Sequence, residues 1–313
     1  ETKLYEVEKP AERVILVAVD EDGSMKDDFL NELEELAQTA GAVTVGRLIQ
    51  RREKRHPGHY IGKGKAEELK LMIAALDADG IITDDELTPA QMRNLEDMLD
   101  TKVMDRTMVI LDIFASRAST REGKIQVELA QLKYRAVRLV GMRNSLSRLG
   151  GGIGTRGPGE KKLETDRRLI HQRISQLKEE LEAVKRHREV TRQQREKDFA
   201  LTAAIVGYTN AGKSTLLNRL TGAGILAEDK LFATLDPTTR SFVMEDGQQI
   251  LLTDTVGFIR KLPHHLIEAF KSTLEEARYS DIILHVVDCS NPQMDMQMHV
   301  VKETLRELGI VDK

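Results

Sequence analysis

The chain has 313 residues, 40% of them hydrophobic, and a formal net charge of -4. This size and apolar content predict a soluble protein of two or three domains, and the small negative charge argues against a general binder of polyanions. One cysteine excludes a disulfide framework, and no apolar run is long enough to cross a membrane.

The apolar run IILHVVDC contains this cysteine, Cys289, and predicts a buried, inert thiol. The first residues are charged and do not resemble a signal peptide. We therefore expect the protein in the cytoplasm, and we expect it to be a monomer. The chain starts with Glu1 and ends on a helical pattern at Lys313, so we expect it to be a fragment of a longer protein.

Short apolar runs alternate with helical patterns from Val14 to about Ile113. The runs are VILVAV, VTVGRLI, GIIT and KVMD, and the helical patterns cover residues 29–40, 66–76 and 89–99. This alternation is typical of a small α/β domain with a largely parallel sheet, which we assign to residues 1–113. Residues 62–65 read Gly-Lys-Gly-Lys; we favour a plain turn over a phosphate site because the P-loop spacing is absent.

Two apolar stripes with helical spacing follow, on either side of the segment GGGIGTRGPGE. The stripes are Ile125, Leu129, Leu132, Ala136 and Leu139, then Leu163, Ile170, Ile174, Leu177, Leu181 and Val184. Each stripe leaves one apolar face that needs a partner, and the segment Gly150 to Glu160 cannot continue a helix. We predict an antiparallel helical hairpin over residues 114–198 with this segment as its tip. The mixed-charge part, 179–197, suits a connector to the next domain.

Positive charge gathers on this hairpin. The basic residues are Arg117, Arg121, Lys124, Lys133, Arg135, Arg138, Arg143, Arg148, Arg156, Lys161, Lys162, Arg167 and Arg168, and the acidic ones are Glu122, Glu128, Glu160, Glu164 and Asp166. A solvated helix face is the alternative, but such an excess in an acidic protein favours contact with nucleic-acid phosphates. Few aromatic residues are available for stacking on bases.

A strand-loop-helix pattern begins at Leu201, where LTAAIV runs into Gly-x-x-x-x-Gly-Lys-Ser and then LLNRL. The loop comprises Gly207, Tyr208, Thr209, Asn210, Ala211, Gly212, Lys213, Ser214 and Thr215. Its glycines let backbone N–H groups surround phosphates, Lys213 is suited to the β- and γ-phosphates, and Ser214 offers a hydroxyl to Mg²⁺. The pattern predicts a P-loop domain over residues 199–313 that binds a nucleoside triphosphate with Mg²⁺.

A second apolar strand, QILLTD, ends in Asp254, Thr255, Val256 and Gly257. A carboxylate at the end of this strand is placed to hold the Mg²⁺ shell through water. Gly257 has no side chain, so its N–H can approach the γ-phosphate.

The intervening segment LFATLDPTTR is turn-rich and should contain a threonine that senses the γ-phosphate. The candidates are Thr234, Thr238 and Thr239. Thr234 is favoured because it lies nearest in sequence to Ser214.

With these motifs assembled, the sequence resembles the HflX family of GTPases. The matching motifs are GYTNAGKST, LFATLDPTTR, DTVGF, GGIGTRGPGE and LETDRR, and the resemblance covers essentially the whole chain. It implies a GTPase that binds the large ribosomal subunit and reaches toward the peptidyl-transferase region with its N-terminal portion. It also implies a role in dissociating stalled ribosomes. From the glycines and the flanking charge we expect the tip Gly150 to Glu160 to contact the ribosomal RNA.

The resemblance further implies that Thr234 binds Mg²⁺ and that Lys213, Thr234 and Gly257 act in catalysis. It assigns nucleotide contact to the segment Phe232, Ala233, Thr234, Leu235 and Asp236. A guanine-reading motif is expected beyond Lys313. Phe258 occupies a position where many GTPases have a glutamine that orients the attacking water. The group that orients this water is therefore unassigned.

Two other functions remain as alternatives. One is a nucleotide-gated RNA-binding module whose hydrolysis is incidental. The other is an ATP-dependent RNA remodeller, disfavoured because the sequence has no second nucleotide motif and no helicase-type arginine constellation.

Overall fold

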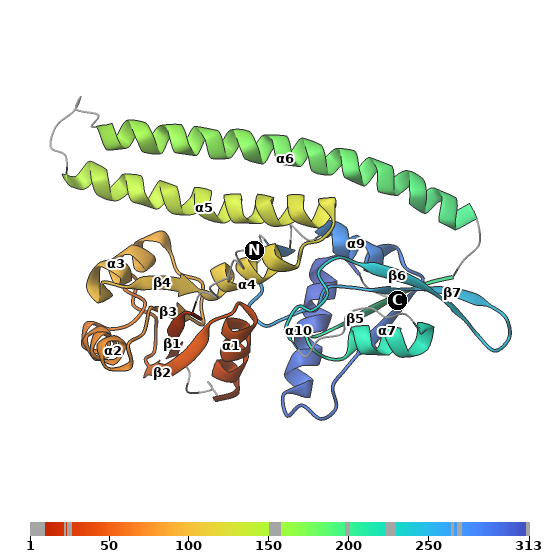
Figure 1. The fold of residues 1–313 in the computed structure, drawn as a ribbon, viewed down its shortest axis with the longest axis horizontal. Coiled ribbons are helices and arrows are strands. Elements are labelled where there is room, and N and C mark those ends of the chain that lie inside the picture. Colours follow the sequence, from red (N-terminus) through yellow and green to blue (C-terminus); the bar gives the residue numbers. More distant parts are fainter. Residues whose placement is uncertain are drawn as a thin grey trace, which may run out of the picture. The chain divides into compact units, whose positions relative to one another are not determined.

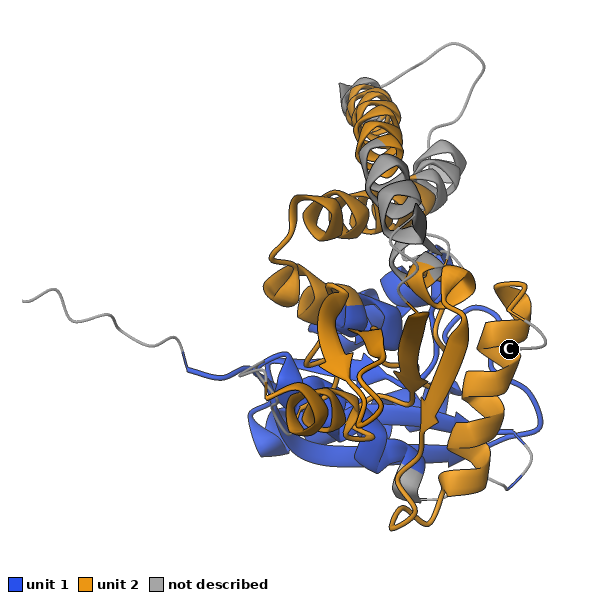
Figure 2. Cartoon of the chain, turned by 90° about the vertical axis from the view of Figure 1, so that its right-hand side faces the viewer, with its two compact units in different colours: residues 1–110 blue, residues 111–313 orange. Residues whose placement is uncertain are grey.

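The computed structural model describes residues 10–21, 23, 27–149, 158–197, 201–222, 230–263, 266–267 and 271–310 (Figure 1). The chain divides into two compact units, residues 1–110 and residues 111–313 (Figure 2). The second unit contains both the helical hairpin and the P-loop domain. Within the described ranges, no helix combines the length and the apolarity that a membrane span requires.

The first unit is built on a four-stranded parallel sheet. Its strands β1 (Arg13–Asp20), β2 (Val43–Arg51), β3 (Gly80–Thr83) and β4 (Lys102–Asp105) lie in the order β2-β1-β3-β4. The helices α1 (Asp27–Thr39), α2 (Lys63–Leu76) and α3 (Pro89–Leu99) connect successive strands, and α4 (Arg106–Arg117) follows β4. The predicted parallel sheet is confirmed. Only α2 begins appreciably earlier than predicted, at Lys63 instead of residue 66.

The strand order determines where the helices lie. Crossovers between parallel strands are right-handed, so α1 covers one face of the sheet, and α2 and α3 cover the other. Helices α2 and α3 accordingly pack against each other. Ile15, Val17 and Val19 of β1 share one core with Leu69 of α2 and Leu95 of α3. All of β1 after its first residue is buried, as expected for a strand covered on both faces.

The predicted hairpin is confirmed in α5 (Arg121–Leu149) and α6 (Pro158–Lys197), which lie side by side (Figure 1). Their shared core contains residues of both predicted stripes: Ile125, Leu129, Leu132, Ala136, Ile170, Ile174, Leu177, Leu181 and Val184. The side chain of Leu163 lies outside the described residues. Helix α5 also buries residues outside the predicted stripe, namely Gln126, Val127, Ala130 and Tyr134.

The predicted tip is shorter than expected at its C-terminal end. Residues 158–160, placed in the loop by the sequence, form the first turn of α6. Proline is compatible with this position because the first helical residues need no backbone hydrogen-bond donor. The remainder of the tip, residues 150–157, lies outside the described residues.

The P-loop domain contains a four-stranded mixed sheet in the order β6-β7-β5-β8. Strands β5 (Leu201–Gly207), β7 (Gln249–Asp254) and β8 (Ile282–Val286) are parallel, and β6 (Thr238–Val243) pairs antiparallel with β7. Helices α7 (Lys213–Thr221), α9 (Lys271–Tyr279) and α10 (Met294–Glu307) complete the described elements of the domain. Since β5 and β7 are parallel neighbours, the P-loop and Asp254 emerge at the same sheet edge.

Two expectations for this domain were wrong. Cys289 is exposed instead of buried, because β8 ends at Val286 and the cysteine belongs to the following turn. The segment expected to be a loop through residue 240 forms a strand from Thr238, whose pairing with β7 supplies the backbone hydrogen bonds.

Candidate functional site

The loop after β5 is held by the loop after β7. The N–H of Thr209 donates to the carbonyl of Phe258 at 2.7 Å, and the N–H of Phe258 donates to the carbonyl of Gly207 at 3.0 Å. Asn210 and Gly212 have positive φ angles of 58° and 88°. These left-handed residues turn the chain into α7, whose N-terminal end therefore borders the pocket.

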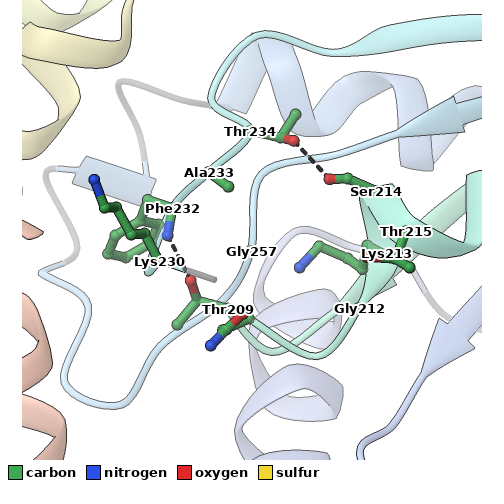
Figure 3. Close-up of a pocket in the computed structure, with 11 residues that line it drawn as sticks. Thr209, Gly212, Lys213, Ser214, Thr215, Lys230, Phe232, Ala233, Thr234 and Gly257 are labelled. Carbon is green, nitrogen blue, oxygen red and sulfur yellow. Dashed lines mark hydrogen bonds between the residues drawn. The ribbon is translucent and has the colours of Figure 1, made fainter. Parts of the chain in front are cut away.

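A pocket lies at this edge of the sheet (Figure 3). Its lining consists of Thr209, Asn210, Gly212, Lys213, Ser214, Thr215, Lys230, Phe232, Ala233, Thr234 and Gly257. Ten of these eleven residues are among those predicted from the sequence. Lys230 was missed, although a cation directly before the segment LFATLDPTTR, residues 231–240, was a visible signal. We call residues 231–240 the switch segment.

Lys213 is a buried cation at the floor of the site. Only 6% of the residue is exposed, and its Nζ donates to the carbonyl of Tyr208 at 2.8 Å. Burial lowers the pKa of Lys213 to about 8, although the Asp254 carboxylate acts in the opposite direction. An ammonium group held this way is stabilised by an anionic ligand such as a phosphate.

Three oxygens gather beside it. The Ser214 Oγ lies 2.8 Å from the Thr234 Oγ1 (Figure 3), and both hydroxyls donate to the Asp254 Oδ2, at 2.6 and 2.9 Å. Asp254 is fully buried, and its Oδ1 has no hydrogen-bond partner among the described residues. Carboxylate and hydroxyl oxygens are ligands that Mg²⁺ prefers.

The spacing of these oxygens also fits Mg²⁺. Adjacent corners of an octahedron with bonds of about 2.0–2.1 Å are separated by about 2.9 Å. The distance between the hydroxyl oxygens of Ser214 and Thr234 is close to this value. In the described part of the chain, no group of three or more His, Cys, Asp or Glu side chains could hold a metal ion. A cation here would thus depend on these few oxygens together with water and phosphate.

Gly257 is required by the close approach of two chain segments. A Cβ at this position would lie 2.6 Å from the Cα of Thr209 and 3.0 Å from the Nζ of Lys213. Any side chain would therefore displace the P-loop backbone or the lysine amine.

Several predicted residues support the site without lining it. The Tyr208 hydroxyl accepts the N–H of Arg260 at 2.8 Å, and the Thr255 Oγ1 donates to the carbonyl of Ile205 at 2.7 Å. Gly207, Ala211, Leu235, Asp236 and Val256 are likewise absent from the lining. Asp254 is absent as well, and it reaches the site through the hydroxyls of Ser214 and Thr234. Phe258 is 1% exposed and belongs to the core, so its side chain cannot orient water in the pocket.

The switch segment approaches the P-loop through Phe232 and Thr234. The N–H of Phe232 donates to the Oγ1 of Thr209 at 2.7 Å (Figure 3). Of the three candidate threonines, only Thr234 borders the pocket, whereas the Thr239 hydroxyl lies 2.9 Å from the hydroxyl of Thr253.

Comparison with known proteins divides the chain into three matched regions. Residues 27–115 match the family described as GTP-binding GTPase N-terminal, and residues 117–195 match GTP-binding GTPase Middle Region. Residues 202–311 match 50S ribosome-binding GTPase.

Individual relatives cover nearly the whole chain. GTPase HflX of Lacrimispora saccharolytica is 77% identical over 314 residues, which is 100% of this chain and 74% of the relative. GTPase HflX of Escherichia coli is 48% identical over 299 residues, covering 95% and 70%. The crystal structure of SsGBP in complex with GDP aligns with a TM-score of 0.54 and 26% identity, covering 96% of this chain and 80% of that chain.

Proposed function

Because this chain belongs to the HflX family of GTPases, we propose that its pocket binds GTP with Mg²⁺ and that GTP hydrolysis switches its binding to the large ribosomal subunit. The observation that carries the proposal is the meeting of Lys213, Ser214, Thr234 and Asp254 at one sheet edge. One cation and a set of hard oxygens are what a triphosphate with Mg²⁺ requires.

Each group has a separate task in this scheme. The N-terminal amides of α7 and the ammonium of Lys213 bind the phosphates. Ser214 and Thr234 would hold Mg²⁺ directly and Asp254 through water, and the ion would neutralise charge on the phosphate oxygens. The N–H of Gly257 would lie beside the γ-phosphate, where Lys213 and Thr234 would also stabilise the charge that develops during hydrolysis.

The ribosomal partner is supported by two observations. The P-loop region matches a family described as 50S ribosome-binding GTPase. The hairpin presents exposed basic side chains on both helices, including Arg121, Lys124, Arg135, Arg167 and Arg168. We propose that the hairpin contacts ribosomal RNA through its tip and that the protein, as a monomer in the cytoplasm, dissociates stalled ribosomes.

Two threonine substitutions test the site. Thr234→Ala should lower GTP hydrolysis at least about tenfold, the order expected when a transition-state contact worth a few kcal/mol is lost. Thr239→Ala is the control, because it removes a threonine hydroxyl whose 2.9 Å contact, with the hydroxyl of Thr253, lies outside the pocket. Hydrolysis rates and melting temperatures should be measured for both.

Ser214→Ala should weaken Mg²⁺-dependent nucleotide binding, measured with a fluorescent GTP analogue across a Mg²⁺ titration. Equal hydrolysis by Thr234→Ala and Thr239→Ala, together with unchanged Mg²⁺ dependence in Ser214→Ala, would show that the assigned site is wrong.

A further inference from the structure

Besides bordering the pocket, the switch segment contacts the junction between α4 and α5 through two of its side chains. Helix α4 ends at Arg117 and α5 begins at Arg121, so three residues join them. Phe232 contacts α4 on one side of this junction, and Asp236 contacts the chain at the other. We call these two contacts the junction clamp.

The first half of the clamp is aromatic. The rings of Phe232 and Phe114 meet edge to face, with centroids 4.8 Å apart and an interplanar angle of 82°. Both residues are 1% exposed. Phe232 has a φ of 54°, a conformation that a bulky residue keeps only when its surroundings impose it. The Phe114 ring and the hydroxyl of Thr209 supply that constraint.

The second half is a carboxylate at the start of a helix. Asp236 accepts hydrogen bonds from the backbone N–H groups of Ser119 and Thr120, at 2.8 and 2.9 Å, and from both of their hydroxyls. Thr120 in turn accepts the N–H of Gly123 within the first turn of α5. A negative charge here is favoured by the positive end of the helix dipole.

Gly123 leaves the space that this carboxylate fills. A Cβ at residue 123 would lie 2.3 Å from the Asp236 Oδ1 and 3.2 Å from its Cγ. Alanine is a better helix former than glycine, so α5 itself gains nothing from glycine at this position. The glycine is explained by the approach of Asp236.

Thr234 lies midway between the two halves of the clamp. Two residues before it, Phe232 is fixed by Phe114, and two residues after it, Asp236 is fixed by Ser119 and Thr120. So short a segment cannot keep both anchors if the angle between α4 and α5 changes. The place of the Thr234 hydroxyl beside Ser214 and Asp254 thus depends on the junction.

We propose that the junction clamp is the positioning device through which the hairpin and the nucleotide site sense each other: Thr234 reaches the Mg²⁺ site only while Phe232 and Asp236 hold the α4–α5 junction. This inference rests on the proposed binding of GTP and Mg²⁺. By linkage, a ligand that holds the hairpin in the clamped arrangement strengthens GTP binding, and GTP favours that arrangement equally.

The test is Gly123→Ala in the complete protein, with Asp236→Asn as a second variant that keeps the side-chain size but removes its charge. Affinities for GDP and for a non-hydrolysable GTP analogue should be measured with Mg²⁺. We expect binding of the analogue to weaken about tenfold, the size of one lost hydrogen bond to a charged group. GDP binding should change by less than about twofold, because only the triphosphate state uses Thr234.

Gly64→Ala is the matched control. Gly64 also lies in the first turn of a helix, α2, but no atom comes within 4 Å of an added Cβ. It should bind both nucleotides as the parent does. Melting temperatures of both glycine variants should be measured beside the affinities, because lost hydrogen bonds of Asp236 and a gain in helix propensity act in opposite directions on stability.

Three results would overturn the clamp. If both variants keep the parent's ratio of analogue affinity to GDP affinity, the clamp does not position Thr234. Equal weakening of the two nucleotides would show a merely structural contact. If the parent binds neither nucleotide and Ser214→Ala binds no less than the parent, the proposed function is wrong and the clamp proposal falls with it.

Discussion

At the residue scale, a buried cation lines the pocket and a buried carboxylate lies just behind the lining hydroxyls, and the hydrogen-bond partners of both are neutral groups. Lys213 donates to a backbone carbonyl, and Asp254 accepts from two hydroxyls. Buried charges are costly unless an opposite charge compensates them. The Asp254 carboxylate compensates Lys213 incompletely, since burial still lowers the pKa of the lysine. A phosphate beside Lys213 and a divalent cation near Asp254 would complete the compensation.

This incompleteness predicts proton uptake when a nucleotide binds. With burial lowering the pKa of Lys213 to about 8, a large share of the empty protein carries the neutral amine at pH 8.5. Phosphate favours the charged form and raises the pKa again. Calorimetric titration with GDP at pH 8.5, in buffers of different ionisation enthalpy, should reveal protons taken up, approaching one per site with increasing pH.

The same titration at pH 7 is the internal control, because Lys213 is then already protonated and its uptake should vanish. The lowered pKa of Lys213 also affects folding stability. Between pH 8 and the ordinary value of 10.5, the unfolded chain binds more protons than the empty folded protein, so this lysine makes stability rise with pH. Equal proton uptake at both pH values would contradict the assignment.

At the element scale, the sequence was informative wherever one local pattern determined one element. The helical stripes through Ile125 and Ile174 predicted the hairpin core because a single spacing fixes which side chains share a face. The strand ending at Asp254 was visible because a short apolar run stops at a carboxylate. Strand β6 was missed because its first residues, Thr238 and Thr239, also suit a turn, and only pairing with β7 decides between the two.

The parts that sequence could not reveal depend on distant residues. Gln126 and Tyr134 are buried on α5 outside the apolar stripe, and polar residues give no periodic signal of burial. Asp236 was assigned to nucleotide contact because it belongs to the switch motif, yet its described hydrogen bonds lead to Ser119 and Thr120, more than a hundred positions away. No local pattern encodes such a pairing.

The hairpin offers a matched prediction within one helix. Leu177 is fully buried between α5 and α6, whereas Leu169 on the same helix is 54% exposed. Leu177→Ala should destabilise the hairpin by about 2–5 kcal/mol, and Leu169→Ala by less than about 0.5 kcal/mol. Hydrogen exchange of the α5 and α6 amides measures this locally; similar losses of protection in both variants would show that the core does not hold the hairpin together.

At the scale of the whole molecule, the chemistry of the pocket needs a contribution from elsewhere. Phe258 cannot orient the attacking water, and the described lining offers no acidic side chain that could act as a base. Hydrolysis by the protein alone should therefore be slow. We expect a polar group from elsewhere in the protein or from the partner to complete the site, as arginine fingers do in other GTPases, where they raise the rate by about 10³–10⁵.

The last prediction joins this dependence to the hairpin tip. Large ribosomal subunits should raise the hydrolysis rate in a saturable titration, and replacing residues 151–157 by a Gly/Ser linker of equal length should weaken that response. The replacement stops before Pro158 so that α6 keeps its first residue. Loss of Arg156 from the tip should also make binding less sensitive to salt, because one phosphate contact disappears.

Basal hydrolysis separates the tip from the pocket. It should be unchanged in the linker variant, since none of the pocket residues is altered, while ribosome dissociation should fail. Two long helices joined by an apolar core would be an unusually large support for a simple surface turn. Glycines in the tip would let its backbone approach RNA closely, which favours a role in RNA contact. If the linker variant responds to the subunit and dissociates ribosomes as the parent does, the tip is only a connector. If the subunit does not change the hydrolysis rate of the parent, the subunit does not complete the site.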